Sequence, residues 1–406
     1  MSRTTLSPAS TVRTPALVRV VAHPVTALVG ILLVSLNMRA ALSAVSPLLD
    51  DVSRDYDLSA TAGGLLTTLP VLLMGATAPF VPRLVRRLGT ERVVAAALLL
   101  LAVGVLLRIA AGAWALFAGS VVLGTAIALL NVTMPGLVKR DFPDRAAAMT
   151  GVYTTSMIVG ATLAAALSVP MEHAFGGWRG SLASWAVLAL VAIAAWLPQL
   201  RKAPAEHRPA TTAPRLPGLW NRPLAWQLAV FMGIQSLLSY TLIAWLPTVL
   251  TSQGMARGTA GAVFAYSNLI QIAGAFLVPL AAGRTSDQRK LVALMVTCNA
   301  GGIADLLAAP VPGAWAWATL LGVAQGGGFG LAMALIVLRS PSASVASQAS
   351  GMAQMVGYFI AAAGPVGFGA LRQLTHSWNL PLALLLLCCA IGLTAGLGAG
   401  KPRQLR

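Results

Sequence analysis

Long apolar stretches follow one another along the whole sequence, and each has the length that crosses a bilayer. A helix needs about 20 apolar residues to span the hydrocarbon core of a membrane. With 57% hydrophobic residues, 10% charged residues and a mean hydropathy of +0.79, the chain cannot hide its apolar side chains inside a water-soluble globule. We therefore predict an all-α integral membrane protein. Its twelve predicted spans are residues 25–49, 61–82, 92–110, 113–137, 146–169, 180–199, 223–250, 259–282, 290–308, 313–338, 347–371 and 378–399.

Basic residues at the ends of these spans predict the orientation of the chain. Lys and Arg keep short loops on the cytoplasmic side of a membrane. Most of the 28 Lys and Arg residues fall on one side if the N-terminus is cytoplasmic. The opposite side keeps Arg54, Arg108, Arg179, Arg257 and Arg372. We therefore predict a multi-pass protein of the cell membrane with both termini in the cytoplasm.

The net charge of +17 does not indicate a nucleic-acid partner, because the charges are spread over short loops rather than gathered on one face. The first apolar run, about 25 residues long, is too long for the core of a cleaved signal peptide and should remain as a span. The three cysteines, Cys298, Cys388 and Cys389, fall inside predicted spans without the spacing of a metal site. We expect no cofactor and no bound metal.

A basic segment rich in Pro and Ala, residues 200–222, is the only long connection between spans and divides them six plus six. An offset of about 200 residues places Pro47 on Pro247 and Gly151 on Gly351, which indicates repeated halves. Each of these prolines is expected to end its span. The predicted divisions are a cytoplasmic tail (1–24), a six-helix bundle (25–199), a cytoplasmic linker (200–222), a second six-helix bundle (223–399) and a cytoplasmic tail (400–406).

The loop between the second and third spans, VPRLVRRLGTER, resembles the Gly-x-x-x-Asp-Arg-x-Gly-Arg loop of the major facilitator superfamily. Arg87 and Gly89 match that motif, whereas Arg86 stands where the family has Asp. The second-half loop GRTSDQRK keeps Gly283 and Asp287. The resemblance implies the twelve-helix fold of that superfamily. It also implies that these loops take part in conformational change, with the acid of the motif supplied by the second half alone.

Two spans narrow the resemblance to one branch of the superfamily. LNMRAALSAVSPLL in the first span and GIQSLLSYTLIAWLPTVL at 233–250 in the seventh are similar to the branch named for cyanate and 2-nitroimidazole transporters. The Asn-x-Arg of the first segment and the Trp-Leu-Pro of the second carry the similarity. The resemblance implies a transporter, but the substrate varies within the branch.

Arg39 lies within the first span, where a charge costs about 2.5–3.5 kcal/mol on insertion scales. Ser35, Arg39, Ser43 and Ser46 are spaced by four, four and three residues, so they share one face of a helix. Among the acids, Asp305 alone lies well within a span, near the outer end of a peripheral one. Arginine keeps its charge, and its planar fork suits an oxyanion. We interpret Arg39 as the residue that binds an anionic substrate group; the alternative is that helix-end carbonyls and waters satisfy it.

Polar residues inside other spans extend the candidate site to both halves. The candidate substrate-binding residues are Arg39, Ser43, Asn131, Gln235, Ser239, Tyr240, Trp245, Asn268, Gln271, Gln325, Gln354 and Tyr358. Each neutral one has the alternative of an interhelical hydrogen bond, which contributes about 0.6 kcal/mol. Asn37 points away from the polar face of Arg39 and is predicted to bond a neighbouring helix. Tyr153 also lies inside a span but outside the candidate set.

The distribution of titratable residues argues against an enzyme. The four histidines fall in tails or loops, and no pair of acids lies inside a span. The favoured function is a secondary active transporter, expected to be monomeric in the bilayer, that moves a small anionic or nitro- or cyanate-like solute by alternating access. The alternative is efflux of apolar or cationic compounds, which usually requires a carboxylate in the cavity. No residue identifies a coupling ion such as the proton.

Overall fold

The structure is a computed structural model that describes residues 24–58, 60–202 and 216–405. The described residues form helices and no strand. Twelve helical segments among the described residues are long and apolar enough to cross a membrane, and each overlaps one of the predicted spans. The chain is therefore a multi-pass membrane protein. The predicted tail up to residue 23 and the linker residues 203–215 lie outside the described residues.

The helices of the two halves follow the predicted spans within a few residues at most ends. The first half contains α1 (Pro24–Ser43), η1 (Ser46–Leu48), α2 (Leu49–Asp55), α3 (Ala60–Thr77), η2 (Ala78–Phe80), α4 (Val81–Leu88), α5 (Thr90–Arg108), α6 (Ala113–Asp141), η3 (Pro143–Arg145), α7 (Ala146–Ala174) and α8 (Trp178–Lys202). The second contains η5 (Leu219–Asn221), α9 (Pro223–Ser252), α10 (Arg257–Ala282), α11 (Arg289–Ala308), α12 (Ala314–Leu338), α13 (Ala343–Thr375) and α14 (Asn379–Ala399).

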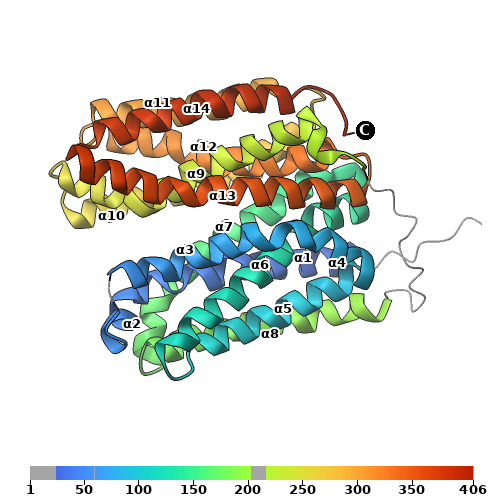
Figure 1. Ribbon diagram of the computed structural model, residues 1–406, viewed down its shortest axis with the longest axis horizontal. Helices are drawn as coiled ribbons and strands as arrows, with labels where there is room; N and C mark the ends of the chain where they lie inside the picture. The colour runs from blue at the N-terminus through green and yellow to red at the C-terminus, as the bar shows by residue number, and fades with distance from the viewer. Residues whose placement is uncertain (1–23, 59, 203–215, 406) are drawn as a thin grey trace, which may run out of the picture.

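Figure 1 shows the two halves as two bundles, with α1 to α8 below and α9 to α14 above. Within the first bundle α5 packs on α6 and α8, and within the second α11 packs on α12 and α14. The bundles meet through α7 with α10 and through α13 with α3 and α6. A site between the halves is therefore lined by helices that are central in each bundle.

The first membrane span ends at Leu48, directly after Pro47, as expected from the sequence, but Pro247 does not end its span. The break in the first span falls just before Pro47, and the chain continues as η1 and α2 to Asp55. α9 runs through Pro247 to Ser252. A proline removes one backbone donor, and neighbouring helices in a bundle can compensate for that loss.

The halves touch at the end of the molecule that carries α4, η5 and the C-terminus, here called the linker end (Figure 1). A Cβ atom on Gly151 of α7 would lie 3.0 Å from the carbonyl oxygen of Phe276, and one on Gly136 would lie 3.1 Å from that of Ala343. The opposite end of the molecule is here called the far end. The part of α7 near it is largely exposed, and within residues 163–170 Ala164 and Ser168 alone are buried. The bundles are therefore packed closely against each other at the linker end.

Candidate functional site

Arg39 of α1 reaches from the first half to the second. Its guanidinium carbon lies 5.7 Å from the ring centroid of Tyr240 in α9 and 5.5 Å from that of Phe329 in α12. The half-buried side chain has no hydrogen bond or ion pair with any described residue. Ring faces attract a cation, but they leave the N–H groups of a guanidinium free to donate. The centre of the molecule thus holds a cation whose donors remain available.

Two other arginines show how this protein satisfies a structural guanidinium. Arg108, 2% exposed, donates to the carbonyl oxygen of Ala41 and to Ser120 Oγ, both at 3.0 Å. Arg339, 5% exposed, donates to the carbonyl oxygens of Ala399 at 2.9 Å and Gly400 at 2.8 Å. The carbonyl-bound alternative considered for Arg39 is therefore seen at these two arginines. The sequence placed Arg108 at the membrane surface; instead it is buried in the first bundle beside the break that follows α1.

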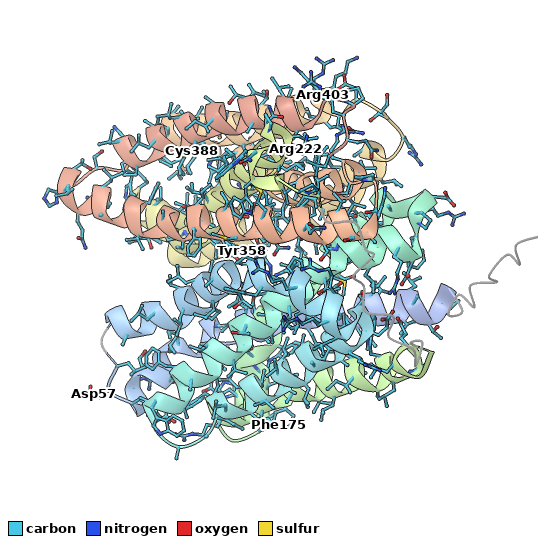
Figure 2. The ribbon with its side chains drawn as sticks, turned by 45° about the vertical axis from the view of Figure 1, so that its right-hand side comes forward. Asp57, Phe175, Arg222, Tyr358, Cys388 and Arg403 are labelled. Carbon is cyan, nitrogen blue, oxygen red and sulfur yellow. The ribbon has the colours of Figure 1, made fainter. Side chains whose placement is uncertain are left out.

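Buried polar atoms without a partner gather on the central helices. Among the described residues, no partner is found for the hydroxyls of Tyr153, Tyr240 and Tyr358, for Gln354 Oε1, or for either amide atom of Asn131. Tyr358 is close enough to Arg39 and Tyr240 to interact with both electrostatically, and Tyr153 interacts in the same way with Tyr358. Figure 2 places Tyr358 on α13 where the second bundle faces the first.

Leaving a buried donor or acceptor unpaired costs about 1–3 kcal/mol per group. Tyr240 and Tyr358 are such groups beside the cation Arg39, so a polar solute bound there gains hydrogen bonds. Four members of the predicted set, Asn131, Tyr240, Gln354 and Tyr358, belong to this unpartnered group. Sequence reasoning left Tyr153 out, because one tyrosine in an apolar helix gives no sign of which neighbour it faces.

A chain of side-chain hydrogen bonds, here called the amide chain, links Ser239, Gln325, Asn299 and Gln235. Ser239 Oγ donates to Gln325 Oε1, and Gln325 Nε2 donates to Asn299 Oδ1 at 2.8 Å. Asn299 Nδ2 donates in turn to Gln235 Oε1 at 3.2 Å. The chain starts at a cavity of about 20 Å³, room for about one water, which Ser239 and Gln325 line together with Gln271. Three predicted residues are thus connected through Asn299, which the sequence did not single out.

The remaining predicted residues fall in different surroundings. Ser43 is half-buried one helical turn beyond Arg39 in α1. On α10, Gln271 Nε2 donates to Asn268 Oδ1 at 2.9 Å. Trp245 Nε1 donates to the carbonyl oxygen of Pro365 at 2.9 Å, inside the second bundle. Of the twelve predicted residues, Trp245 is the one that the structure commits most clearly to helix packing.

Two further polar residues of α1, one of them on the face of Arg39, have structural partners. Asn37 Nδ2 donates to the carbonyl oxygen of Leu33 at 2.8 Å and to that of Leu188 in α8 at 3.1 Å, so the predicted bond to a neighbouring helix is confirmed. Ser35 is buried and donates to the carbonyl oxygen of Ile31 at 2.7 Å.

The predicted conformational loops lie at the linker end. Gly89, with φ of 87°, separates α4 from α5, and Arg87 is exposed. A Cβ atom on Gly283 would lie 2.8 Å from Cβ of Ala147 in the other half. Asp287 accepts from the backbone and guanidinium of Arg289, and these hydrogen bonds lower the pKa of its carboxyl to about 2. The second-half loop therefore meets the first half through Gly283, while Asp287 pairs within its own loop.

Two six-helix bundles around a polar centre are the architecture of membrane transporters built from repeated halves. The Major Facilitator Superfamily matches residues 28–365, and the chain belongs to that family of transporters, which are not enzymes. The 2-nitroimidazole transporter of Escherichia coli (strain K12) is 38% identical over 380 residues, which cover 93% of this chain and 96% of the relative. The cyanate transport protein CynX of the same organism is 33% identical over 363 residues, 89% of this chain and 94% of the relative.

Among solved structures, the proton:xylose symporter XylE bound to 6-bromo-6-deoxy-D-glucose superposes with a TM-score of 0.73 at 13% identity, covering 94% of this chain and 97% of that chain. The predicted twelve-helix fold and the resemblance to the cyanate and 2-nitroimidazole branch are both confirmed.

Proposed function

We propose that this protein is a secondary active transporter for a small anion, or for a planar nitro- or cyanate-like solute. One observation carries the proposal: Arg39 stands at the boundary of the halves with free donors and no acid or carbonyl partner among the described residues. A guanidinium in that state gains most from an oxyanion, because charge-assisted hydrogen bonds are about twice as strong as neutral ones. Relatives named for 2-nitroimidazole and cyanate support small, electron-rich solutes of this kind.

The arrangement supports alternating access. A solute on Arg39 would touch the first half through α1 and the second through Tyr240 of α9, so its binding energy can depend on how the halves are placed. We propose that the solute reaches the central site from the far end, because the halves are in close contact at the linker end. Transport then requires the far end to close and the contacts at Gly136 and Gly151 to separate.

We also propose that the linker end faces the cytoplasm, that the protein resides in the cell membrane and that it works as a monomer with no nucleic-acid partner. The basic residues Arg83, Arg86, Arg87 and Arg92 at the linker end support this orientation. The linker end, where the halves are in close contact, would then be closed to the cytoplasm.

Counterflow in proteoliposomes tests the function. Purified protein is reconstituted with unlabelled solute inside, and uptake of labelled cyanate, other small anions, a nitroimidazole and a lipophilic cation is compared. Anions or the nitro compound should exchange through the wild type and not through Arg39→Gln. Exchange of the lipophilic cation alone would favour the alternative, efflux of cationic compounds.

A further inference from the structure

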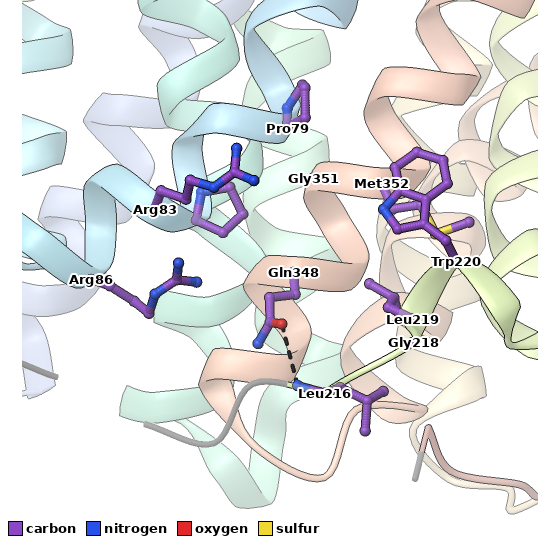
Figure 3. A pocket seen from close by; sticks show the side chains of 11 residues that line it. Pro79, Arg83, Arg86, Leu216, Gly218, Leu219, Trp220, Gln348, Gly351 and Met352 are labelled. Atoms are coloured by element: carbon purple, nitrogen blue, oxygen red, sulfur yellow. Dashed lines mark hydrogen bonds between the residues drawn. The ribbon is translucent and has the colours of Figure 1, made fainter. Parts of the chain in front are cut away.

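A second cavity, distinct from the central site, opens at the linker end between the two halves. Its volume is about 260 Å³. It is lined by Pro79, Pro82, Arg83 and Arg86 of the first half and by Leu216, Gly218, Leu219, Trp220, Gln348, Gly351 and Met352 of the second. Gln348 Oε1 accepts from the backbone nitrogen of Leu216 at 3.4 Å, which fixes the segment before α9 against α13 (Figure 3).

The walls of this cavity are basic on one side and apolar on the other. Figure 3 shows the guanidinium groups of Arg83 and Arg86 extending from α4 toward α13. No acid is among the lining residues, and Arg83 has no hydrogen bond or ion pair within the described part of the chain. The facing wall is formed by Leu219, Trp220 and Met352.

Trp220 marks the depth of the cavity in the membrane. Its side chain is 45% exposed and packs edge-to-face with Trp226 at a centroid distance of 5.9 Å. Trp226 Nε1 donates to the carbonyl oxygen of Trp220 at 2.7 Å. Tryptophans that are partly exposed at the end of spanning helices lie at the level of lipid headgroups.

We propose that this cavity binds the headgroup of an anionic phospholipid. The phosphate is placed on Arg83, with the positive charge of Arg86 on the same wall, and the start of the acyl chains lies along Trp220 and Met352. Basic pockets between spanning helices are typical binding sites for such headgroups. A free phosphate would use the two arginines but would leave the apolar wall unoccupied, so the lining favours the lipid.

The site also connects lipid binding to conformation. A Cβ atom on Gly351 would lie 3.1 Å from the carbonyl oxygen of Ala78 and 3.1 Å from Pro82 Cγ, so the cavity adjoins a closest approach of the halves. Opening the linker end must draw α4 away from α13 and thereby separate the two walls. A ligand that needs both walls stabilises the closed linker end. This inference does not depend on the nature of the transported solute.

Native mass spectrometry of the full-length, delipidated protein tests the proposal with phosphatidylglycerol and phosphatidylcholine as probes. Wild type should retain one phosphatidylglycerol in preference to phosphatidylcholine, and Arg83→Gln/Arg86→Gln should weaken that binding at least tenfold. The matched control is Arg87→Gln/Arg92→Gln, which removes the same charge from exposed positions outside the cavity and should leave binding within threefold. Equal losses in the two double variants, or equal retention of the two lipids by wild type, would overturn the proposal.

Two further measurements keep the result interpretable. Inorganic phosphate at millimolar concentration should raise the melting temperature less than phosphatidylglycerol does; an equal rise identifies a site for a free anion and overturns the lipid assignment. If the arginine variants fail to fold, quenching by brominated phosphatidylglycerol replaces them. Trp220→Phe should then remove a saturable part of the quenching seen in wild type, and a quenching curve that does not change overturns the proposal.

Discussion

Gln325 Nε2 donates to Asn299 Oδ1 at 2.8 Å, which joins a central helix of the second bundle to a helix at its edge. Asn299 also donates to Gln235 in α9. One side chain of α11 therefore fixes the orientation of two glutamine amides on helices that face the centre. An amide can turn its oxygen or its nitrogen toward a solute, so this orientation bears on which solutes fit.

Replacing Asn299 by Ala should weaken solute binding while the protein remains folded. Gln325 Nε2 and Gln235 Oε1 would lose their partners, at a cost of about 1–3 kcal/mol per unsatisfied group. Isothermal titration should show a raised Kd, and counterflow should show a raised KM with a smaller change in the maximal rate. The control is Asn37→Ala, which also removes two hydrogen bonds of a buried Asn but lies on the α8 side of α1. Equal changes in Kd for the two variants would mean that the amide chain only stabilises the fold.

Arg39 variants should separate binding from folding. Arg39→Lys keeps the charge but loses the planar fork, and binding should fall by about 1.5–3 kcal/mol, the value of a charge-assisted hydrogen bond. Arg39→Gln should lose more. The melting temperature of both should stay close to that of wild type, because Arg39→Lys keeps the charge and Arg39→Gln removes a half-buried cation without breaking an ion pair.

Arg108→Gln provides the contrast for this prediction. Arg108 supplies two hydrogen bonds to buried acceptors, so its loss should destabilise the protein by about 1–3 kcal/mol. Thermal melting of purified protein measures both effects. An Arg39→Gln variant that unfolds like Arg108→Gln, or that binds solute as tightly as wild type, contradicts the role assigned to Arg39.

Asp305→Asn should leave transport intact. Asp305 is half-buried in the last turn of α11, at the far end, and α11 packs on α12 and α14. Counterflow by the variant, normalised to the amount reconstituted, is expected within twofold of wild type. A complete loss of exchange with normal expression would instead assign this carboxylate a part in the transport cycle.

Thiol labelling in intact cells should report the orientation. In a variant with Cys298, Cys388 and Cys389 replaced by Ser, a cysteine is introduced at Leu88 or at Phe175. These residues are 41% and 57% exposed at the linker end and the far end, respectively. A membrane-impermeant maleimide should label position 175 in intact cells and position 88 after permeabilisation alone. The reverse pattern would place the linker end outside the cell.

The positions of the helices could be predicted because the sequence itself shows the length of each apolar run and the charged residues of the short loops between the runs. The surroundings of Arg39 could not be. Its contacts with Tyr240 and Phe329 depend on how α9 and α12 are rotated against the first half, and residue spacing within one helix does not define a rotation between helices. Asn299 could not be predicted as part of the site for a related reason. A single Asn in an apolar peripheral span is as typical of an ordinary interhelical hydrogen bond as of a binding site.

Arg108 shows a different limit. Its place at the end of a span suggests a side chain in water, but the break after α1 lies beside it and offers Ala41 as an acceptor. Nothing in the sequence near Arg108 indicates that break. The orientation of the chain in the membrane and the cytoplasmic position of the linker stay predictions.

Close packing of small residues joins the two halves at the linker end. Each of five ion pairs between described residues joins two residues of the same half. Close backbone contacts that cross this end involve Gly136, Gly151, Gly283 and Gly351. Dispersion between touching atoms fades over a fraction of an ångström, so a slightly separated interface keeps almost none of it. Opening of this end should therefore be all-or-none rather than graded. In protein freed of anionic lipid, its rate should change little with ionic strength, because screening acts only on charges.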